Sequence, residues 1–142
     1  LCLKNKRKFE RNMGLKNDRP SFSFKRLLKS FHYAMAGLKH TWKKEQNFRI
    51  HLLFTIVVIL FAQLLKVPIV EQVLLFIVIG LVLSLELINT AIENVVDMIT
   101  KTYDKRAKIV KDVAAGAVLI FSIIAVIIGI LIFVPKIVEL FL

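Results

Sequence analysis

The sequence predicts an all-α membrane protein in which an N-terminal amphipathic surface helix precedes three transmembrane helices. The chain has 142 residues, 57% of them hydrophobic, and a formal net charge of +11. Residues 1–49 contain 14 Lys and Arg against three acids, whereas residues 50–142 contain seven basic and seven acidic residues. A nucleic-acid-binding domain carries its basic charge on the folded domain itself, so this division excludes that class. It indicates an apolar membrane domain behind a basic flank.

The basic flank contains a tail and a predicted helix. Residues 1–22 are expected to be a basic disordered tail, and residues 23–142 a single integral-membrane domain. Within residues 22–45, apolar and aromatic side chains recur at helical spacing while Lys and Arg occupy other positions. This pattern is typical of a helix on an anionic membrane surface, with Trp42 at headgroup depth. The simplest interpretation of this helix is a membrane-surface anchor without a catalytic role.

Three apolar segments are predicted to cross the membrane, at about residues 50–66, 69–99 and 113–134. The third contains 22 residues without charge, and at roughly 1.5 Å per residue it spans about 33 Å, enough for a bilayer core. The first is shorter, but Arg49 and Lys66 at its ends can extend to the headgroups. The second contains acids in its C-terminal half, although its apolar pattern continues through them.

The distribution of Lys and Arg predicts the orientation of the protein. The second loop, residues 98–112, holds five Lys and Arg, whereas the turn at residues 66–71 and the C-terminal tail hold one Lys each. Positively charged flanks and loops stay in the cytoplasm. We therefore expect a multi-pass protein with a cytoplasmic N-terminus, a cytoplasmic second loop that faces the ATP pool, and an external C-terminus.

Acidic and amide side chains form a stripe in the second span, at Glu86, Asn89, Glu93 and Asp97. At 100° per residue these positions share one face of an otherwise apolar helix. Ionisable groups inside a membrane are costly and usually face a bundle interior or a water-filled cavity. A seam for helix packing is the alternative, but Asn and Ser would form it at lower cost. The stripe therefore predicts a functional site.

Three kinds of chemistry are open to this stripe: a proton relay or cation site in a small transporter, a Mg²⁺ site beside substrate phosphates, and a di-iron or di-manganese site. The last requires Glu-x-x-His motifs, and the second span has no His. The sequence contains neither Gly-x-x-x-x-Gly-Lys-Ser/Thr nor Gly-x-Gly-x-x-Gly, the two common nucleotide-binding loops. Its single cysteine, Cys2, excludes a disulfide within one chain.

Two further features lie on the predicted cytoplasmic side. Glu45 is a lone acid in a basic stretch beside the membrane, where it could simply balance charge. Lys111 and Asp112 begin the third span: Asp112 suits a helix N-terminus, and Lys111 makes the second loop electropositive, as a nucleotide site requires.

These features together resemble the prokaryotic diacylglycerol kinase family, which includes the undecaprenol kinases. The resemblance extends from about Phe24 to Lys136 and depends on Glu45, on the run Glu86-Leu-Ile-Asn89-Thr-Ala-Ile-Glu93-Asn-Val-Val-Asp97, and on Lys111-Asp112-Val-Ala-Ala-Gly-Ala-Val. It implies a homotrimer in a bacterial cell membrane, each subunit having a surface helix and three spans. It also implies that the γ-phosphate of MgATP is transferred to a lipid hydroxyl.

The resemblance implies a role for each candidate residue. Glu86 resembles the general base for the lipid hydroxyl, and Asn89 would orient groups around it. Glu45 and Glu93 would hold Mg²⁺ on the ATP phosphates. The remaining candidates would bind the nucleotide, with Lys111 neutralising phosphate charge beside Asp112: Arg26, Tyr33, Asp97, Tyr103, Lys111 and Asp112.

The expected lipid substrate is undecaprenol, with diacylglycerol as the alternative. The run Asn47-Phe-Arg-Ile-His51 and the tail Ile132-Phe-Val-Pro-Lys-Ile137 resemble the Gram-positive branch of the family, whose members tend to be undecaprenol kinases. The rival of another class is a small proton- or cation-coupled transporter that uses Glu86 and Glu93. A non-catalytic membrane scaffold is a third possibility, but it leaves the acids in the span unexplained.

Overall fold

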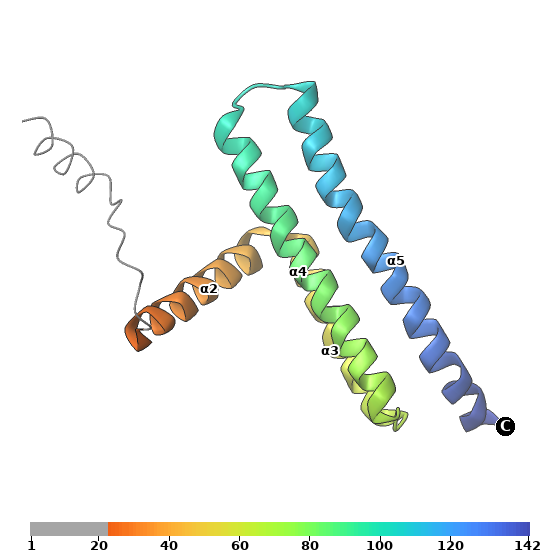
Figure 1. Cartoon of the computed structure of the whole chain (residues 1–142). Helices are drawn as coiled ribbons and strands as arrows, with labels where there is room; N and C mark the ends of the chain where they lie inside the picture. The colour runs from red at the N-terminus through yellow and green to blue at the C-terminus, as the bar shows by residue number, and fades with distance from the viewer. Residues whose placement is uncertain (1–22) are drawn as a thin grey trace, which may run out of the picture. The chain divides into compact units, whose positions relative to one another are not determined.

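The computed structural model describes residues 23–142, and the predicted basic tail of residues 1–22 lies outside them. Four α-helices and no strand make up this part of the chain (Figure 1): α2 (Phe24–Lys44), α3 (Gln46–Leu64), α4 (Ile69–Ile99) and α5 (Lys105–Phe141). The last three are long and apolar enough to cross a membrane. The predicted all-α class with three spans is therefore confirmed.

The chain divides into two units between Ala36 and Gly37, inside α2. In the described part of the first unit, every helical residue is exposed, including the apolar Phe24, Leu28 and Phe31. The predicted helix over residues 22–45 is thus present as α2. Its location on a membrane surface and the single-domain organisation of residues 23–142 stay predictions.

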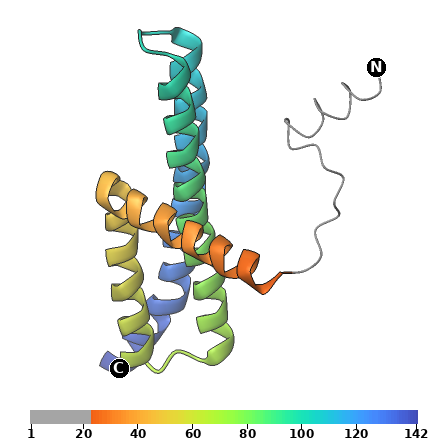
Figure 2. The same ribbon diagram turned by 90° about the vertical axis from the view of Figure 1, so that its left-hand side faces the viewer.

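The turn between α3 and α4 is short and tightly hydrogen-bonded. Lys66 adopts a left-handed conformation with φ of 48°, and the Val67 amide donates to the carbonyl oxygen of Ala62 at 3.0 Å. Pro68 then precedes the first residue of α4, where its fixed φ and missing N–H are well tolerated. Because the turn is so short, α3 and α4 run antiparallel side by side (Figures 1 and 2).

The predicted spans differ from the helices mainly at their ends. The second span, 69–99, coincides with α4, whereas the first begins earlier than predicted, at Gln46 rather than about residue 50. The third predicted span, 113–134, lies inside the longer α5. A charge-free run marks the part of a helix that suits hydrocarbon, while capping and turn residues determine where the helix itself begins and ends.

Helix α4 is the central packing element of the bundle, with its longest contact along α5 and a shorter one along α3. At the end of the bundle that carries the α3–α4 turn, a small core joins all three helices through Ala62, Val67, Leu75 and Ile132. The rings of Phe61 and Phe133 meet edge to face there, with centroids 6.4 Å apart. Most other apolar side chains are exposed, as expected for a surface that contacts lipid tails or further copies of the chain.

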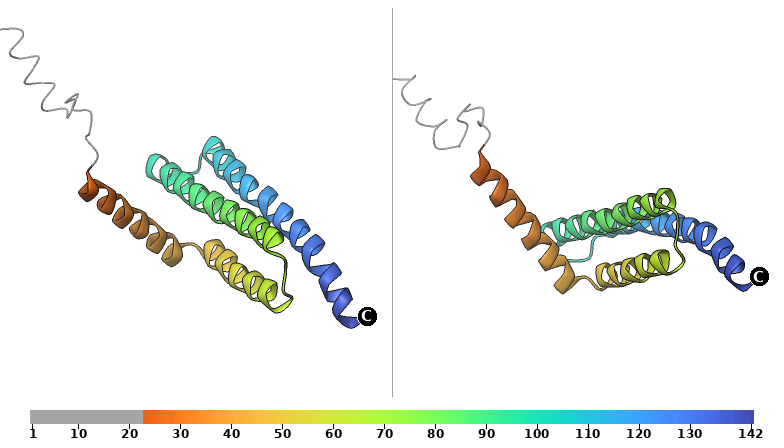
Figure 3. Two further views of the ribbon diagram at one scale, coloured as in Figure 1. Left: turned by 60° about the horizontal axis from the view of Figure 1, so that its bottom comes forward. Right: turned by 90° about the horizontal axis from the view of Figure 1, so that it is seen from below.

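Differences in helix length determine where a site can form. At about 1.5 Å per residue, the 19 residues of α3 extend about 28 Å, close to the thickness of a bilayer core. Helix α4, with 31 residues, and helix α5, with 37, are much longer than α3. Both therefore continue past the beginning of α3, and their connection lies at the end of the bundle opposite the α3–α4 turn (Figure 3).

Candidate active site

The buried face of α4 changes from apolar to polar halfway along the helix. Its first half buries Leu75, Val78 and Val82 at helical spacing. The same face continues with Glu86, which is 2% exposed, and then with Asn89 and Thr90, which are also buried. Since positions three and four residues apart share one face, the predicted stripe is a direct continuation of the helix-packing surface.

Two further carboxylates, those of Glu45 and Glu93, lie within electrostatic range of Glu86. Glu45 is the single residue between α2 and α3, and its extended backbone (φ −100°, ψ 119°) separates the two helices. Its side chain does not cap α3, so its carboxylate remains available to a ligand. The break between the two helices thus positions Glu45 beside the acids of α4.

These three carboxylates have no cationic partner in residues 23–142. The ion pairs described there join Arg106 to Asp104, Lys111 to Asp97 and Lys136 to Glu71. Like charges that lie together in an apolar setting repel each other and are stabilised by a cation or by a proton. The arrangement is therefore suited to bind a positively charged group.

Asn89 holds one of the three carboxylates in place. Its Nδ2 donates to Glu93 Oε1 at 3.0 Å. Its Oδ1 is buried and has no hydrogen-bond partner within the described residues, so it can accept a hydrogen bond from an incoming hydroxyl. Asn89 thus connects the carboxylate cluster to any group that approaches it.

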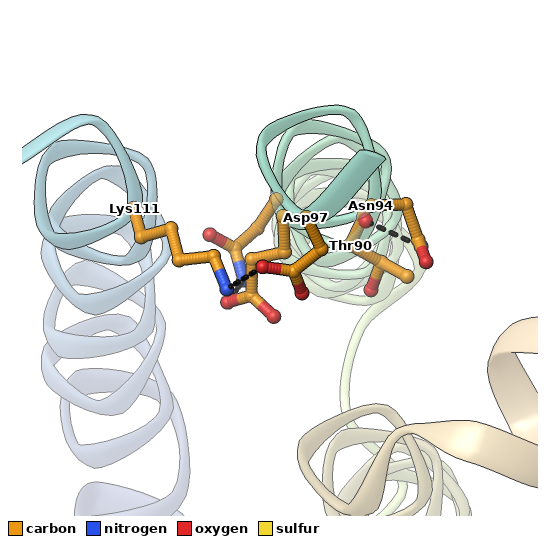
Figure 4. A network of polar contacts seen from close by, with 6 residues as sticks. Thr90, Asn94, Asp97 and Lys111 are labelled. Carbon is orange, nitrogen blue, oxygen red and sulfur yellow. Dashed lines mark hydrogen bonds and ion pairs between the residues drawn. The ribbon is translucent and has the colours of Figure 1, made fainter. Parts of the chain in front are cut away.

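A second polar group lies beyond the cluster, where α4 and α5 extend past α3. Lys111 Nζ of α5 donates to Asp97 Oδ1 of α4 at 2.6 Å (Figure 4). The pair is partly exposed, as ligand-binding charges must be. On another side of α4, the amide of Asn94 donates to the carbonyl oxygen of Thr90 at 2.7 Å (Figure 4).

The connection between α4 and α5 fixes the position of Lys111. Asp104 caps α5: its Oδ1 accepts hydrogen bonds from the amides of Arg106 at 2.7 Å and Ala107 at 3.4 Å. Asp is among the preferred N-cap residues because its carboxylate satisfies amides that have no partner in the helix. With the first turn of α5 fixed, Lys111 lies two turns further on and reaches Asp97.

An open depression of about 200 Å³ lies beside this ion pair. It is lined by residues from the end of α4, the connection and the start of α5: Val96, Asp97, Thr100, Thr102, Tyr103, Asp104, Ala107, Lys108 and Lys111. Tyr103 is largely exposed, so its ring is available for stacking on a planar ligand. Two lysines and an aromatic ring around an open depression suit an anionic, partly aromatic ligand.

The structure brings most of the predicted site residues together, but not all. Glu45, Glu86, Asn89 and Glu93 form one group, and Asp97, Tyr103 and Lys111 form the neighbouring one. Asp112 is exposed beside Lys111 and makes no side-chain contact to a polar group in the described part of the chain. Arg26 and Tyr33 belong to the first unit of the chain, whereas both groups belong to the second.

Two residues at the candidate site were not identified from the sequence. Thr90 is buried on the same face as Glu86, and its hydroxyl has no partner among residues 23–142. Its spacing of four residues from Glu86 was the available signal. Lys108 lines the depression, but one Lys among five in a basic loop carries no distinguishing pattern.

The donor set is compatible with Mg²⁺. No group of three or more His, Cys, Asp or Glu side chains among residues 23–142 is disposed as a complete metal cage. Mg²⁺ does not require one, because it usually takes one or two carboxylates and completes its shell with waters and substrate phosphates. Glu45, whose carboxylate makes no hydrogen bond or ion pair within the described chain, and Glu93 could supply those carboxylates.

Comparison with known proteins identifies the family. The sequence model of prokaryotic diacylglycerol kinase matches residues 32–133. The chain belongs to the prokaryotic diacylglycerol kinase family. Family membership makes the protein a membrane lipid kinase. It therefore argues against the transporter and the scaffold, the two alternatives considered from the sequence. The matched region contains every predicted site residue except Arg26, which precedes it.

Individual relatives include kinases of two names. The undecaprenol kinase of Bacillus subtilis is 45% identical over 111 residues, which cover 78% of this chain and 90% of that protein. A diacylglycerol kinase of Synechocystis is 44% identical over 115 residues, covering 80% of this chain and 66% of that protein. The diacylglycerol kinase of Escherichia coli K12 is 36% identical over 104 residues, covering 73% and 85%.

Proposed function

We propose that this member of the diacylglycerol kinase family transfers the γ-phosphate of ATP to the hydroxyl of undecaprenol and releases undecaprenyl phosphate and ADP. The observation that carries the proposal is Glu86, a carboxylate buried on the packing face of α4 with the carboxylates of Glu45 and Glu93 within electrostatic range. A carboxylate that meets a substrate hydroxyl can accept its proton as a general base.

The proposed reaction is a direct transfer of one phosphoryl group. The Glu86 carboxylate takes the proton of the lipid hydroxyl while the hydroxyl oxygen forms a bond to the γ-phosphorus. The bond from that phosphorus to the bridging oxygen of ADP breaks, and ADP leaves. Phosphoryl transfer depends mainly on positioning and on neutralisation of charge, so one base, one oriented carboxylate and one lysine form a chemically sufficient set.

Charge neutralisation is assigned to the residues around Glu86. Glu45 and Glu93 would hold Mg²⁺, which when bound neutralises the phosphates and stabilises the leaving ADP. Lys111, now paired with Asp97 at 2.6 Å, would exchange that carboxylate for a phosphate oxygen. The depression beside it would receive the nucleotide, with Asp97, Tyr103 and Asp112 near it and with Arg26 and Tyr33 of the surface helix as further contacts.

The choice of lipid rests on the relatives. The Bacillus subtilis relative named undecaprenol kinase matches this chain over 90% of its own length, which supports undecaprenol as the substrate. Diacylglycerol is the alternative, because a relative named diacylglycerol kinase is nearly as similar at 44% identity. Both lipids present a single hydroxyl at the membrane surface, so the same chemistry serves either.

We also propose that the enzyme acts as a homotrimer in a bacterial cell membrane, with its N-terminus in the cytoplasm and its C-terminus outside. The open side of the site supports an assembly: Asp97 and Tyr103 are exposed in the single chain. A second copy could cover them. The basic second loop supports the orientation.

A phosphoryl-transfer assay tests the proposed function. Purified protein in micelles is incubated with labelled ATP and Mg²⁺, and undecaprenol and diacylglycerol are supplied in parallel. We expect labelled undecaprenyl phosphate as the main product, and a loss of activity of at least about 10²-fold on Glu86→Gln, which preserves shape but removes the base. Glu139→Gln, an exposed acid near the C-terminus, is the matched control. Absence of transfer to both lipids would refute the proposal.

A further inference from the structure

A second ion pair joins α4 and α5 at the end of the bundle opposite the proposed active site. Lys136 Nζ of α5 lies 3.2 Å from Glu71 Oε2 of α4, and both side chains are less exposed than those of a typical surface pair, at 20% and 37%. Glu71 Oε2 is buried and makes no hydrogen bond within the described residues. Lys136 is therefore the group that compensates the negative charge of this oxygen. Nothing in the proposed reaction uses either residue.

The two interhelical ion pairs are equally spaced along the two helices. Glu71 and Asp97 are 26 residues apart on α4, and Lys111 and Lys136 are 25 residues apart on α5. At about 1.5 Å per residue, both intervals are close to 38 Å. The pairs therefore satisfy one axial register of the antiparallel helices at the same time.

The interface between the two ends does not select a register strongly. Its buried aliphatic side chains are Leu75, Val78 and Val82 on α4 and Val118 and Ile132 on α5. The buried polar residues of α4, Glu86, Asn89 and Thr90, make no side-chain hydrogen bond or ion pair to α5 within the described residues. In a membrane, aliphatic helix contacts depend on van der Waals packing without a hydrophobic driving force. A slide by one helical turn exchanges one aliphatic neighbour for another, whereas it moves both lysines about 5.4 Å away from their carboxylates.

The connection between the helices also permits such a slide. Thr100–Asp104 are the five residues from the end of α4 to the cap of α5, and at most about 3.5 Å per residue they can extend about 17 Å. A one-turn slide needs about a third of that reach. Helix-end electrostatics does not explain Lys136 either, because it is not in the last turn of α5.

We infer that Glu71 and Lys136 are positioning residues that fix the register of α5 on α4 and thereby hold Lys111 opposite Asp97. The pair acts from the external end of the bundle on the phosphate-binding end. The inference rests on the proposed function only for its kinetic readout, because the register itself is a structural property.

Removal of either charge tests the inference. Glu71→Gln and Lys136→Gln should each raise the KM for ATP about tenfold while kcat changes less, because misplacement of a positioning group by about 1 Å or more is costly. The charge-swapped protein, Glu71→Lys with Lys136→Glu, should recover a KM within about threefold of wild type. Glu139→Gln and Lys66→Gln remove exposed charges at the same end of the bundle and should leave the KM unchanged.

A cross-link gives a readout that needs no activity. In a Cys2→Ser background, cysteines at Thr100 and Lys108, which both line the depression, should form a disulfide efficiently on oxidation. We expect Glu71→Gln and Lys136→Gln to lower its yield at least about twofold, and the charge swap to restore it. If a single variant does not fold, the Glu71→Gln/Lys136→Gln double variant, which leaves no unpaired charge, replaces it.

Opposite outcomes separate the two proposals. Wild-type protein that phosphorylates neither lipid but shows the charge-dependent cross-link would refute the proposed function and support the register. An unchanged KM and unchanged cross-linking in the single variants, or a charge swap that restores neither, would overturn the inference.

Discussion

At the scale of residues, the proposed active site is built by a change in polarity along one helix face. Leu75, Val78 and Val82 are replaced at the next position of the same face by Glu86. A carboxylate there is taken out of solvent by the packing that buries the three aliphatic side chains. Asn89, one turn further on, orients Glu93 through a 3.0 Å hydrogen bond. A single face of α4 therefore carries the proposed base, an orienting amide and a proposed ligand for a cation.

The orienting role of Asn89 leads to a prediction on the Mg²⁺ requirement. Asn89→Ala removes the hydrogen bond to Glu93, and loss of a group that orients a metal ligand typically weakens metal binding 10- to 100-fold. We expect the Mg²⁺ concentration for half-maximal activity to rise by at least about tenfold, with Glu93→Gln giving an equal or larger increase. Initial rates measured over a Mg²⁺ titration provide the test.

Asn94→Ala is the control for this titration. Its amide also makes a hydrogen bond on α4, but to the backbone carbonyl of Thr90 rather than to a carboxylate. The Mg²⁺ requirement should therefore stay within about twofold of wild type. An equal shift in Asn89→Ala and Asn94→Ala would mean that general loosening of α4, and not the orientation of Glu93, causes the effect.

At the scale of elements, the start of α5 determines the position of Lys111. The charge-free run of the third span begins at Val113, but α5 begins at Lys105 because Asp104 caps it. The additional turns lie beyond the beginning of α3 and carry Lys108 and Lys111 into the depression beside Asp97. The cap thus connects a local hydrogen bond to the position of Lys111, the proposed phosphate-binding group.

Asp104 therefore offers a test of this element. Asp104→Ala removes acceptors for the amides of Arg106 and Ala107 and should destabilise the first turn of α5 by about 1 kcal/mol. Hydrogen exchange of these amides should become several-fold faster. Asp104→Asn keeps the cap but removes the exposed 3.9 Å contact with Arg106, which is worth little, so it should exchange like wild type. Equal acceleration in both variants would contradict the capping role.

At the scale of the whole molecule, the exposed apolar surface of the bundle exceeds its core. Only a small cluster around Leu75 and Ile132 joins all three spans, while most apolar side chains on α3, α4 and α5 are exposed. Lipid tails can cover such a surface, and so can identical chains.

The proposed homotrimer is tested directly by native mass spectrometry of the protein released from micelles. We expect a dominant species with the mass of three chains, and kinase activity that elutes with this species on size exclusion. Full activity in a fraction that contains only single chains would contradict the trimer.

The sequence by itself determined the class of the protein, its spans and the stripe of candidate residues. Hydrophobic runs and the 3.6-residue period act along one chain segment, so they predict α4 and its face from Glu86 to Asp97 without reference to any neighbour. Family-specific residues such as Glu45 were identified by resemblance, because a lone acid in a basic stretch has no pattern of its own.

Only the tertiary structure decided how these residues meet. The pairing of Lys111 with Asp97, the approach of Glu45 to Glu86 and the ion pair between Glu71 and Lys136 each join different elements. Such contacts depend on helix ends and on the register between helices, which capping, turn geometry and packing determine together. Those terms involve atoms distant in sequence, and no local pattern records them.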